Sequence, residues 1–433
     1  MVRTSHHPEH HPLGALPLRA APPALAWLAL GLLAGCVPMP GESGASSVAR
    51  HSSAGIKTVE LGKPKTGGAA RPAMPGENVP AIKIDTVGYP LGWQKIAVFN
   101  LDPVGATLKN ESGKTVWTAA PRHVEDRGLD AASKDPVWQV DFSEFDRSGR
   151  YHFEQGDQKS DSFLIGDDLY REAIVAGLKS FYFQRTRTAL KAPYATWKGD
   201  AYLRAEASHV HEDVGWDLED YPKKKKRWTM RGGWHDAGNF DMYVPSTAPS
   251  AQALLLAYEW NPGWFSDGQL NIPESGNKIP DILDEARWGL DWILSMQEPD
   301  SGAFRHREAV MQWGAEGPAD KDMTVRWVAG VSTAATAKGV AVMGLASRLY
   351  QRWDPDFARA CRVSAQKGWA WLKAHPERVK VDGKGSPQPK WDDEPNMTDV
   401  GARMVAAVEI WRTFRDDSAL ALARKLMAEK EAQ

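Results

Sequence analysis

The residues best suited to chemistry lie in one short stretch, residues 231–244, which reads Arg-Gly-Gly-Trp-His-Asp-Ala-Gly-Asn-Phe-Asp-Met-Tyr-Val. Asp236 and Asp241 supply carboxyl groups for acid–base work, and the aromatic residues around them supply flat faces, mostly with polar edges. Three glycines permit backbone angles that other residues avoid, so the stretch predicts a tight, shaped loop. The alternative is a glycine-rich turn whose aromatic rings only pack.

The composition limits the class of partner. With 433 residues the chain is long enough for a sizeable core and two domains. Its net charge is −2, from 53 Lys and Arg against 55 Asp and Glu, so nothing points to nucleic acid or to an anionic membrane surface. The 19 Trp outnumber the 10 Tyr and the 12 Phe. Because Trp is well suited to lie flat on a sugar ring, the composition favours a glycan partner.

The N-terminus has the features of an export signal. The apolar run of residues 24–34 is too short to span a bilayer as a mature helix. It ends in Leu33-Ala-Gly-Cys36, which resembles the lipobox of bacterial lipoproteins, whose cysteine carries lipid after cleavage. With Cys36 lipidated, only Cys361 remains, so no internal disulfide is expected and Cys361 is predicted to be a buried apolar residue. We expect an exported bacterial lipoprotein, held by its lipid anchor at the cell surface or in the periplasm.

The patterning divides the chain into four parts. After the signal (residues 1–36), residues 37–80 are rich in Gly, Pro, Ser and Ala and predict a flexible linker. Residues 81–166 hold short alternating apolar segments separated by turn residues, which predicts an antiparallel β-sandwich. Its expected strands span 82–89, 95–100, 114–118, 138–142 and 149–154.

From residue 167 to residue 433 the period changes to about 3.6 and predicts helices. The expected helices span 169–187, 246–260, 279–296, 332–352, 357–374, 400–415 and 418–430. A long run of helices with site-like residues in the loops between them suggests an all-α toroid, in which the loops build a cleft at one end.

One charged segment raises the question of a metal ion. His209-Val-His-Glu-Asp and Asp217-Leu-Glu-Asp precede a basic run at residues 223–227. No ordered ligand spacing appears, so we read these residues as solvated loop faces and expect no metal and no required cofactor. Calcium is an alternative without support.

Taken together, the motifs resemble glycoside hydrolase family 9, in the subgroup with an immunoglobulin-like domain before an (α/α)6 catalytic barrel. Residues 232–239 resemble the family signature Gly-Gly-Trp-x-Asp-Ala-Gly-Asp. Residues 279–297 are similar to its third helix, and Ser332-Thr-Ala-Ala-Thr-Ala is similar to a later inner helix. Asp85-Thr-Val-Gly-Tyr and the hinge at residues 163–172 also fit this subgroup. The likeness runs from about residue 82 to residue 415.

The resemblance implies hydrolysis of β-1,4-glucans such as cellulose, with inversion at the anomeric carbon. One ionised carboxyl group then activates water, and a protonated one gives its proton to the leaving oxygen. In the family both Asp residues of Asp-Ala-Gly-Asp hold the water, and the second is the principal base. By position Asp236 is the first of them, while Asn239 stands where the principal base should be. An amide takes no proton near neutral pH, so Asp236 is left as the base candidate and Asp241 as a weaker one.

The resemblance also implies contacts to the substrate. The candidates come from the signature loop and from the loop after the third helix, which builds cleft wall in the family. They are Trp234, His235, Asp241, Tyr243, Phe304, Arg305 and His306.

The family's general acid is a Glu near the end of the barrel, and no matching segment is visible before Gln433. We therefore expect an incomplete toroid and a chain that, as written, does not hydrolyse β-glucan even after Asn239→Asp. Three hypotheses follow from these observations. The chain is a cell-surface β-glucanase of family 9 ancestry, a non-catalytic glycan-binding relative, or a truncated product without function.

Overall fold

The computed structural model describes residues 80–204, 214–217, 227–236, 238, 240–310, 318–322, 324–381 and 399–431. They belong to two compact units, with the boundary between Gly177 and Leu178 inside helix α2 (Arg171–Gln184). Cys36, Asn239, the expected signal and linker, and most of the charged segment at 209–227 lie outside the described residues. Tyr170 donates a hydrogen bond to Asp85 at 2.8 Å, which ties the start of α2 to the first unit.

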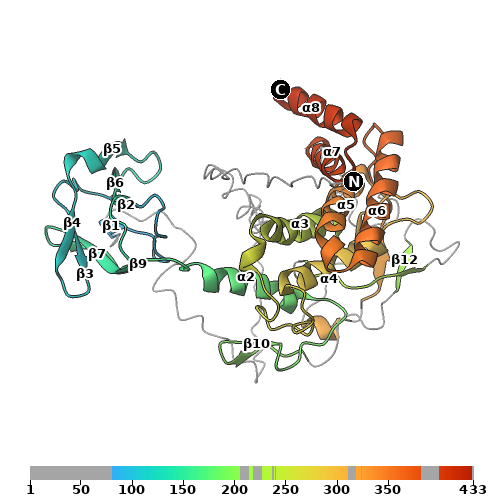
Figure 1. The fold of residues 1–433 in the computed structure, drawn as a ribbon, viewed down its shortest axis with the longest axis horizontal. Helices are drawn as coiled ribbons and strands as arrows, with labels where there is room; N and C mark the ends of the chain where they lie inside the picture. Colours follow the sequence, from blue (N-terminus) through green and yellow to red (C-terminus); the bar gives the residue numbers. More distant parts are fainter. Residues whose placement is uncertain are drawn as a thin grey trace, which may run out of the picture. The chain divides into compact units, whose positions relative to one another are not determined.

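The first unit is a sandwich of two antiparallel sheets (Figure 1). One sheet has the order β1-β2-β6-β5, and the other has the order β4-β3-β7-β8, with β9 also paired to β7. The strands are β1 (Ile82–Lys83), β2 (Ile96–Phe99), β3 (Thr107–Asn110), β4 (Thr115–Thr118), β5 (Val124–Leu129), β6 (Pro136–Asp141), β7 (Gly149–Gln155), β8 (Gln158–Lys159) and β9 (Phe163–Ile165), with a 3₁₀ turn η2 (Pro121–His123). The predicted β-sandwich is confirmed. Strand β5 escaped prediction because it is exposed along nearly its whole length and shows no alternation.

Aromatic rings fill the space between these sheets. Phe142 and Phe153 meet edge to face with ring centroids 5.1 Å apart, and Tyr89 meets Phe142 at 5.0 Å. All three are buried, with Phe99 and Phe163 beside them. Large buried rings dominate the stability of a small core, so this cluster explains why the unit holds together.

The second unit is built mainly of helices (Figure 1). They are α3 (Val244–Trp260), α4 (Asp281–Ser295), α5 (Thr333–Leu349), α6 (Pro355–Ala374), α7 (Val400–Phe414) and α8 (Asp417–Glu431), with 3₁₀ turns η4 (Pro262–Trp264), η5 (Ala319–Lys321) and η6 (Tyr350–Arg352). Helix α5 packs against α3, α6 and α7, and it is buried on nearly every side. Its small residues permit this close packing: at Gly339 a β-carbon would collide with the ring of Phe304.

Strands also occur in this unit, which corrects the expectation of an all-α domain. A five-stranded sheet has the order β13-β12-β16-β15-β14. The strands are β12 (Val214–Asp217), β13 (Arg227–Thr229), β14 (Met242–Tyr243), β15 (Arg307–Val310) and β16 (Arg326–Val328), and a separate hairpin joins β10 (Thr196–Trp197) to β11 (Asp200–Ala201). Strands of two to four residues are too short for a two-residue period to be seen in the sequence. This sheet positions the loop at 231–243.

Two further findings concern the described residues. No helix among them is both long enough and apolar enough to cross a membrane. Cys361 is free and buried in α6, as predicted, and burial raises the pKa of its thiol.

Candidate active site

The loop at 231–243 is fixed by backbone hydrogen bonds on both sides. His235 N donates to Gln184 O at 2.8 Å, and Gly233 N donates to Trp288 O at 2.9 Å. Gly232 and Gly233 have φ values of +64° and +94°, and a β-carbon on Gly232 would strike the carbonyl of Trp288. These glycines are therefore required by the close approach of the loop to α4. The predicted shaped loop is what the structure shows.

Asp236 is the first residue of the tip of this loop, which runs from residue 236 to residue 241. Its N–H donates to Asp241 O at 3.0 Å, so that residues 236 and 241 close the tip like the ends of a short hairpin. The side chain is partly exposed, and its Oδ2 accepts a hydrogen bond from Ser246 Oγ at 3.0 Å. Ser246 is in the first turn of α3, where the helix dipole favours a carboxylate. This arrangement orients one oxygen of Asp236 and holds the carboxylate at a surface.

Asp241 has the opposite environment, since its side chain has no exposed surface. Its Oδ1 accepts from Val310 N at 2.8 Å and pairs with Arg326 at 2.9 Å. Tyr243 donates to Oδ2 at 3.3 Å. Burial raises the pKa of the Asp241 carboxyl to about 6, although these partners favour its charged form. The predictions of Asp241 as a substrate contact or a substitute base have no support in this arrangement, because its oxygens face the protein interior.

Trp234 was predicted to contact substrate, and the structure instead buries it. Its indole N–H donates to Glu285 Oε1 at 2.8 Å, and its ring packs edge to face on Phe181 with centroids 5.0 Å apart. The ring covers Gly289 of α4, where a β-carbon would fall on the indole. Glu285 is itself paired with Arg185 at 2.9 Å and is fully buried. Trp234 therefore anchors the loop to α4 and offers no face to a sugar.

The three candidates of the second loop are also buried. Phe304 is in the core beside α5, and Arg305 pairs with Glu298 at 2.7 Å. His306 Nδ1 lies 2.8 Å from Ser332 Oγ, the hydroxyl that also caps the start of α5. Their burial gives no support to a contact with substrate, and that role stays a prediction. Phe304 and His306 join the loop to α5, whereas Arg305 pairs with Glu298 of the same loop.

His235 and Tyr243 lie at the edges of the loop. His235 is buried and its ring approaches that of Phe240, with centroids 5.1 Å apart. Phe240 has a φ of +57°, an unusual value for a bulky residue, so this contact supports the tip in a strained conformation. Tyr243 is half-buried and precedes α3 as its N-cap residue. Its role in binding substrate stays a prediction.

Several residues that hold this site were not predicted from the sequence. Glu308 of β15 accepts from the indole N–H of Trp292 at 2.9 Å and pairs with Arg187. Arg326 of β16 pairs with both Asp241 and Asp322. The pairs of Arg187 with Glu308 and of Arg326 with Asp241 link segments far apart in the sequence, so spacing alone does not find them. Ser246, the partner of Asp236, could have been found from the sequence, because it follows Pro245 and proline is common at the start of a helix.

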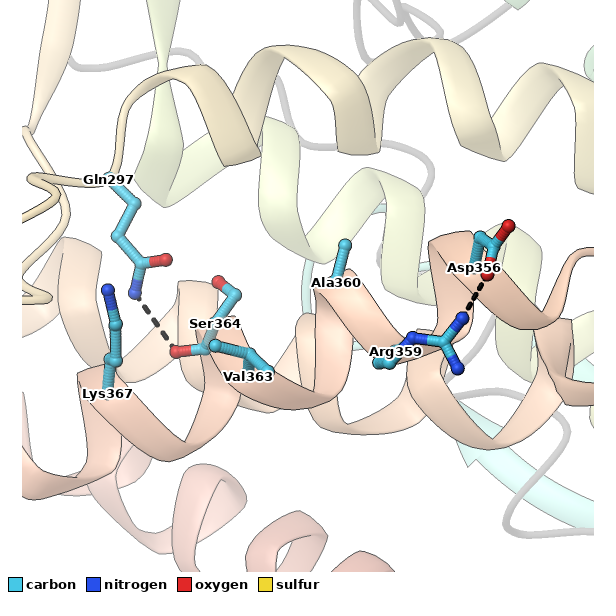
Figure 2. A pocket seen from close by; sticks show the side chains of 7 residues that line it. All are labelled: Gln297, Asp356, Arg359, Ala360, Val363, Ser364 and Lys367. Atoms are coloured by element: carbon cyan, nitrogen blue, oxygen red, sulfur yellow. Dashed lines mark hydrogen bonds and ion pairs between the residues drawn. The ribbon is translucent and has the colours of Figure 1, made fainter.

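No group of three or more His, Cys, Asp or Glu side chains in the described part of the chain is arranged to hold a metal ion. A pocket of about 420 Å³ lies away from the loop, along α6 (Figure 2). Its lining is Gln297 and α6 residues between 356 and 367. Figure 2 shows the Gln297 amide directed at the Ser364 carbonyl, which it reaches at 3.0 Å, and Asp356 paired with Arg359. The one carboxyl group that lines this pocket is the exposed Asp356, which is paired with Arg359, so the pocket is not the candidate active site.

Comparison with known proteins finds a matching family profile for each of the two units. The sequence profile of the cellulase N-terminal immunoglobulin-like domain matches residues 77–160, and that of glycosyl hydrolase family 9 matches residues 170–433. Endoglucanase D of Acetivibrio thermocellus is 30% identical over 345 residues, which cover 78% of this chain and 52% of that protein. A xyloglucan-specific endo-beta-1,4-glucanase of Bacteroides ovatus is 30% identical over 308 residues, or 69% of this chain and 50% of that protein.

Solved structures agree with these matches. A metagenome-derived glycoside hydrolase family 9 endoglucanase superposes with a TM-score of 0.65 at 33% identity, covering 80% of this chain and 64% of that one. The chain spans about half the length of the curated relatives named above. Because the family profile matches more than half of the chain, and the immunoglobulin-like profile precedes it, the chain belongs to glycosyl hydrolase family 9.

Proposed function

We propose that the chain acts as a glycoside hydrolase on β-1,4-glucan, with Asp236 as the carboxylate that activates water. This proposal replaces the expectation of an inactive chain, because the family profile matches residues 170–433. The observation that carries this proposal is the hydrogen bond from Ser246 to a partly exposed Asp236 at the start of α3. Three other carboxyl groups bonded to this loop or its sheet, Asp241, Glu285 and Glu308, are buried and occupied by cations or N–H groups. Asp236 is therefore the carboxylate of the loop that we assign to chemistry.

The proposed step follows from this geometry. Ionised Asp236 takes a proton from water while the water oxygen bonds to the anomeric carbon. The bond from that carbon to the leaving oxygen breaks, and the leaving oxygen takes a proton from a protonated carboxyl group. In the family this acid is a Glu near the end of the barrel, and we assign its role to no residue among those described. Attack from the face opposite the leaving group inverts the anomeric carbon. The relatives named for endoglucanase and xyloglucan-specific endo-beta-1,4-glucanase activity support a β-1,4-glucan backbone as the shared substrate class.

A second candidate function is glycan binding without hydrolysis. The residue that favours it is Asn239, which stands where the family has its principal base and takes no proton near neutral pH. A site with this substitution keeps its affinity for glucan and loses proton transfer.

Two measurements on the full chain separate the candidates. Release of reducing sugar from carboxymethylcellulose supports the hydrolase. Binding of cellohexaose in calorimetry without any release supports the binding protein. A chain that shows neither contradicts both proposals.

We also propose that α3, α5 and α7 are inner helices of an (α/α)6 barrel. The burial of α5 on nearly every side and its packing against both α3 and α7 support this arrangement. An experimental structure in which the site-facing end of α5 opens to solvent on a second side would contradict it.

Export and lipid anchoring are a further proposal, supported by the Leu33-Ala-Gly-Cys36 motif after an apolar run. Cys36→Ser is expected to stop processing or to release the protein from membranes. Unchanged processing together with unchanged membrane fractionation would contradict the proposal.

A further inference from the structure

The first turn of α3 lacks part of the hydrogen bonding that a helix normally supplies. Pro249 lies inside α3 and has no N–H, so the carbonyl of Pro245, four residues earlier, is without its intrahelical donor. The proline ring also crowds that carbonyl. Lys338 Nζ of α5 donates to the same oxygen at 2.8 Å. The lysine thus fills the position that Pro249 leaves open.

Lys338 is an unusual residue for this task. Its side chain is largely enclosed, and burial lowers the pKa of its ammonium group. Enclosing a charge is costly unless the group makes bonds that compensate. An uncharged residue would pack in α5 at no such cost. The hydrogen bond to Pro245 is therefore the feature that explains a lysine at this position.

The turn held by Lys338 is the turn that orients Asp236. Ser246 follows Pro245 directly, and its hydroxyl donates to Asp236 Oδ2 at 3.0 Å. Two other hydrogen bonds besides the backbone bonds of the helix hold the same turn. Val244 N donates to His306 O at 2.9 Å, and the side chain of Ser250 donates to Ser246 O at 2.9 Å. A small displacement of this turn moves the donor of Asp236, and misplacement of about 1 Å can cost up to 10²-fold in rate.

We propose that Lys338 is a positioning residue for Asp236, which acts by satisfying the carbonyl that Pro249 leaves without a donor. Lys338 touches no substrate in this proposal. Its effect passes through Pro245 and Ser246 to the carboxylate. The proposal rests on the role of Asp236 in the proposed function, whereas the pairing of Lys338 with Pro249 is a property of the fold alone.

A double-mutant cycle tests the proposal. Lys338→Met removes the donor and keeps the aliphatic stem, and Pro249→Ala supplies a backbone N–H that can bond to Pro245 O. Lys338→Met is expected to lower kcat on carboxymethylcellulose by about tenfold and to leave KM within about twofold, because it alters alignment more than binding. In the Pro249→Ala background the same change is expected to have little effect. Lys373→Met, at an exposed position of the neighbouring α6, is the matched control.

Amide hydrogen exchange gives a readout that does not depend on activity. Exchange in the peptide that covers residues 244–252 is expected to be faster in Lys338→Met and to return toward the parent rate in the double variant. Equal loss of kcat in both backgrounds, or unchanged kcat and exchange in Lys338→Met, would overturn the proposal. A parent chain that releases no sugar contradicts the proposed function, and the exchange cycle then decides alone whether Lys338 and Pro249 are coupled.

Discussion

Asp236 and Asp241 are five positions apart, yet the fold gives them different tasks. Asp236 is held at a surface by a single hydroxyl, whereas Asp241 is enclosed and paired with Arg326. Two carboxyl groups of one loop are thus separated into a candidate for chemistry and a support for the loop. Residue types and spacing identified both carboxyl groups but not their different tasks. Those tasks depend on burial and on the pairing of Asp241 with Arg326 of β16, which come from distant parts of the chain.

The pair between Arg326 and Asp241 allows a prediction on stability. Arg326→Met leaves Asp241 and Asp322 buried without their cation, so we expect a loss of about 3–5 kcal/mol in the free energy of unfolding. Urea denaturation measures this loss. Arg359→Met serves as the control, because Arg359 is mostly exposed and surface ion pairs contribute about 0–1 kcal/mol. Equal effects of the two substitutions would contradict the structural role of Arg326.

Asp284 of α4 predicts a dependence of stability on pH. Burial, together with the nearby charges of Glu274, Asp281 and Asp267, raises the pKa of its carboxyl to about 7, although Asn277 donates to both oxygens. The folded state therefore binds this proton more tightly than the unfolded state. The stabilisation is fully present below the ordinary pKa of about 4 and is lost as the pH rises through about 7.

Asp284→Asn removes this titration. We expect the variant to lose less stability than the parent between pH 5 and pH 8, and to be more stable at pH 8 by roughly 1–2 kcal/mol. Thermal unfolding across this pH range measures the difference, with the exposed Asp300→Asn as the control. A parallel decline in the parent and in Asp284→Asn would show that another group is responsible.

At the scale of elements, the sequence predicted helices better than strands. The predicted helix at 357–374 is observed as α6 (Pro355–Ala374), which begins earlier because Asp354 caps it by accepting from Phe357 N. The predicted helix at 332–352 ends at Leu349 and continues as the 3₁₀ turn η6. Long amphipathic segments carry a periodic signal, while β14, with two residues, carries none. Sheet β13-β12-β16-β15-β14 depends on pairings between distant segments, which no local pattern shows.

Two helical glycines give opposite predictions for one substitution. Gly289→Ala places a methyl group against the indole of Trp234, so we expect a loss of at least about 1–3 kcal/mol. Gly177→Ala in α2 meets nothing within 4 Å and is expected to stabilise the protein by about 0.5–1 kcal/mol, because alanine favours the helix. Denaturant unfolding of both variants measures the contrast. A stable Gly289→Ala variant would contradict the packing of Trp234 on α4.

At the scale of the whole molecule, the two units have separate cores. The aromatic cluster of the sandwich includes no residue of the helical unit. We therefore expect residues 81–166, expressed alone, to fold with a β-rich circular dichroism spectrum and to unfold cooperatively. Limited proteolysis of the full chain is expected to yield a fragment of this size. A helical or unfolded spectrum from the isolated segment would contradict this independence.

The family and its two units could be predicted from the sequence, because motifs such as Gly-Gly-Trp-His-Asp-Ala-Gly-Asn are specific when several of them occur in one chain. The contacts inside the site were not. Trp234, Phe304 and His306 have side chains that suit sugar binding, and the fold uses them as buried supports. Lys338, which the sequence did not mark, reaches the turn next to Asp236. Chemical type alone does not say which side of a loop faces solvent.

The most direct test of the central claim is the rate of reducing-sugar release from carboxymethylcellulose by the full chain and by Asp236→Asn. The substitution keeps the shape of the side chain and the partner Ser246 but removes the group that accepts a proton. If Asp236 is the base, release falls by about 10²–10⁴-fold while thermal stability and cellohexaose binding stay close to those of the parent. Release by Asp236→Asn within about twofold of the parent rate, at equal stability, would contradict the assignment.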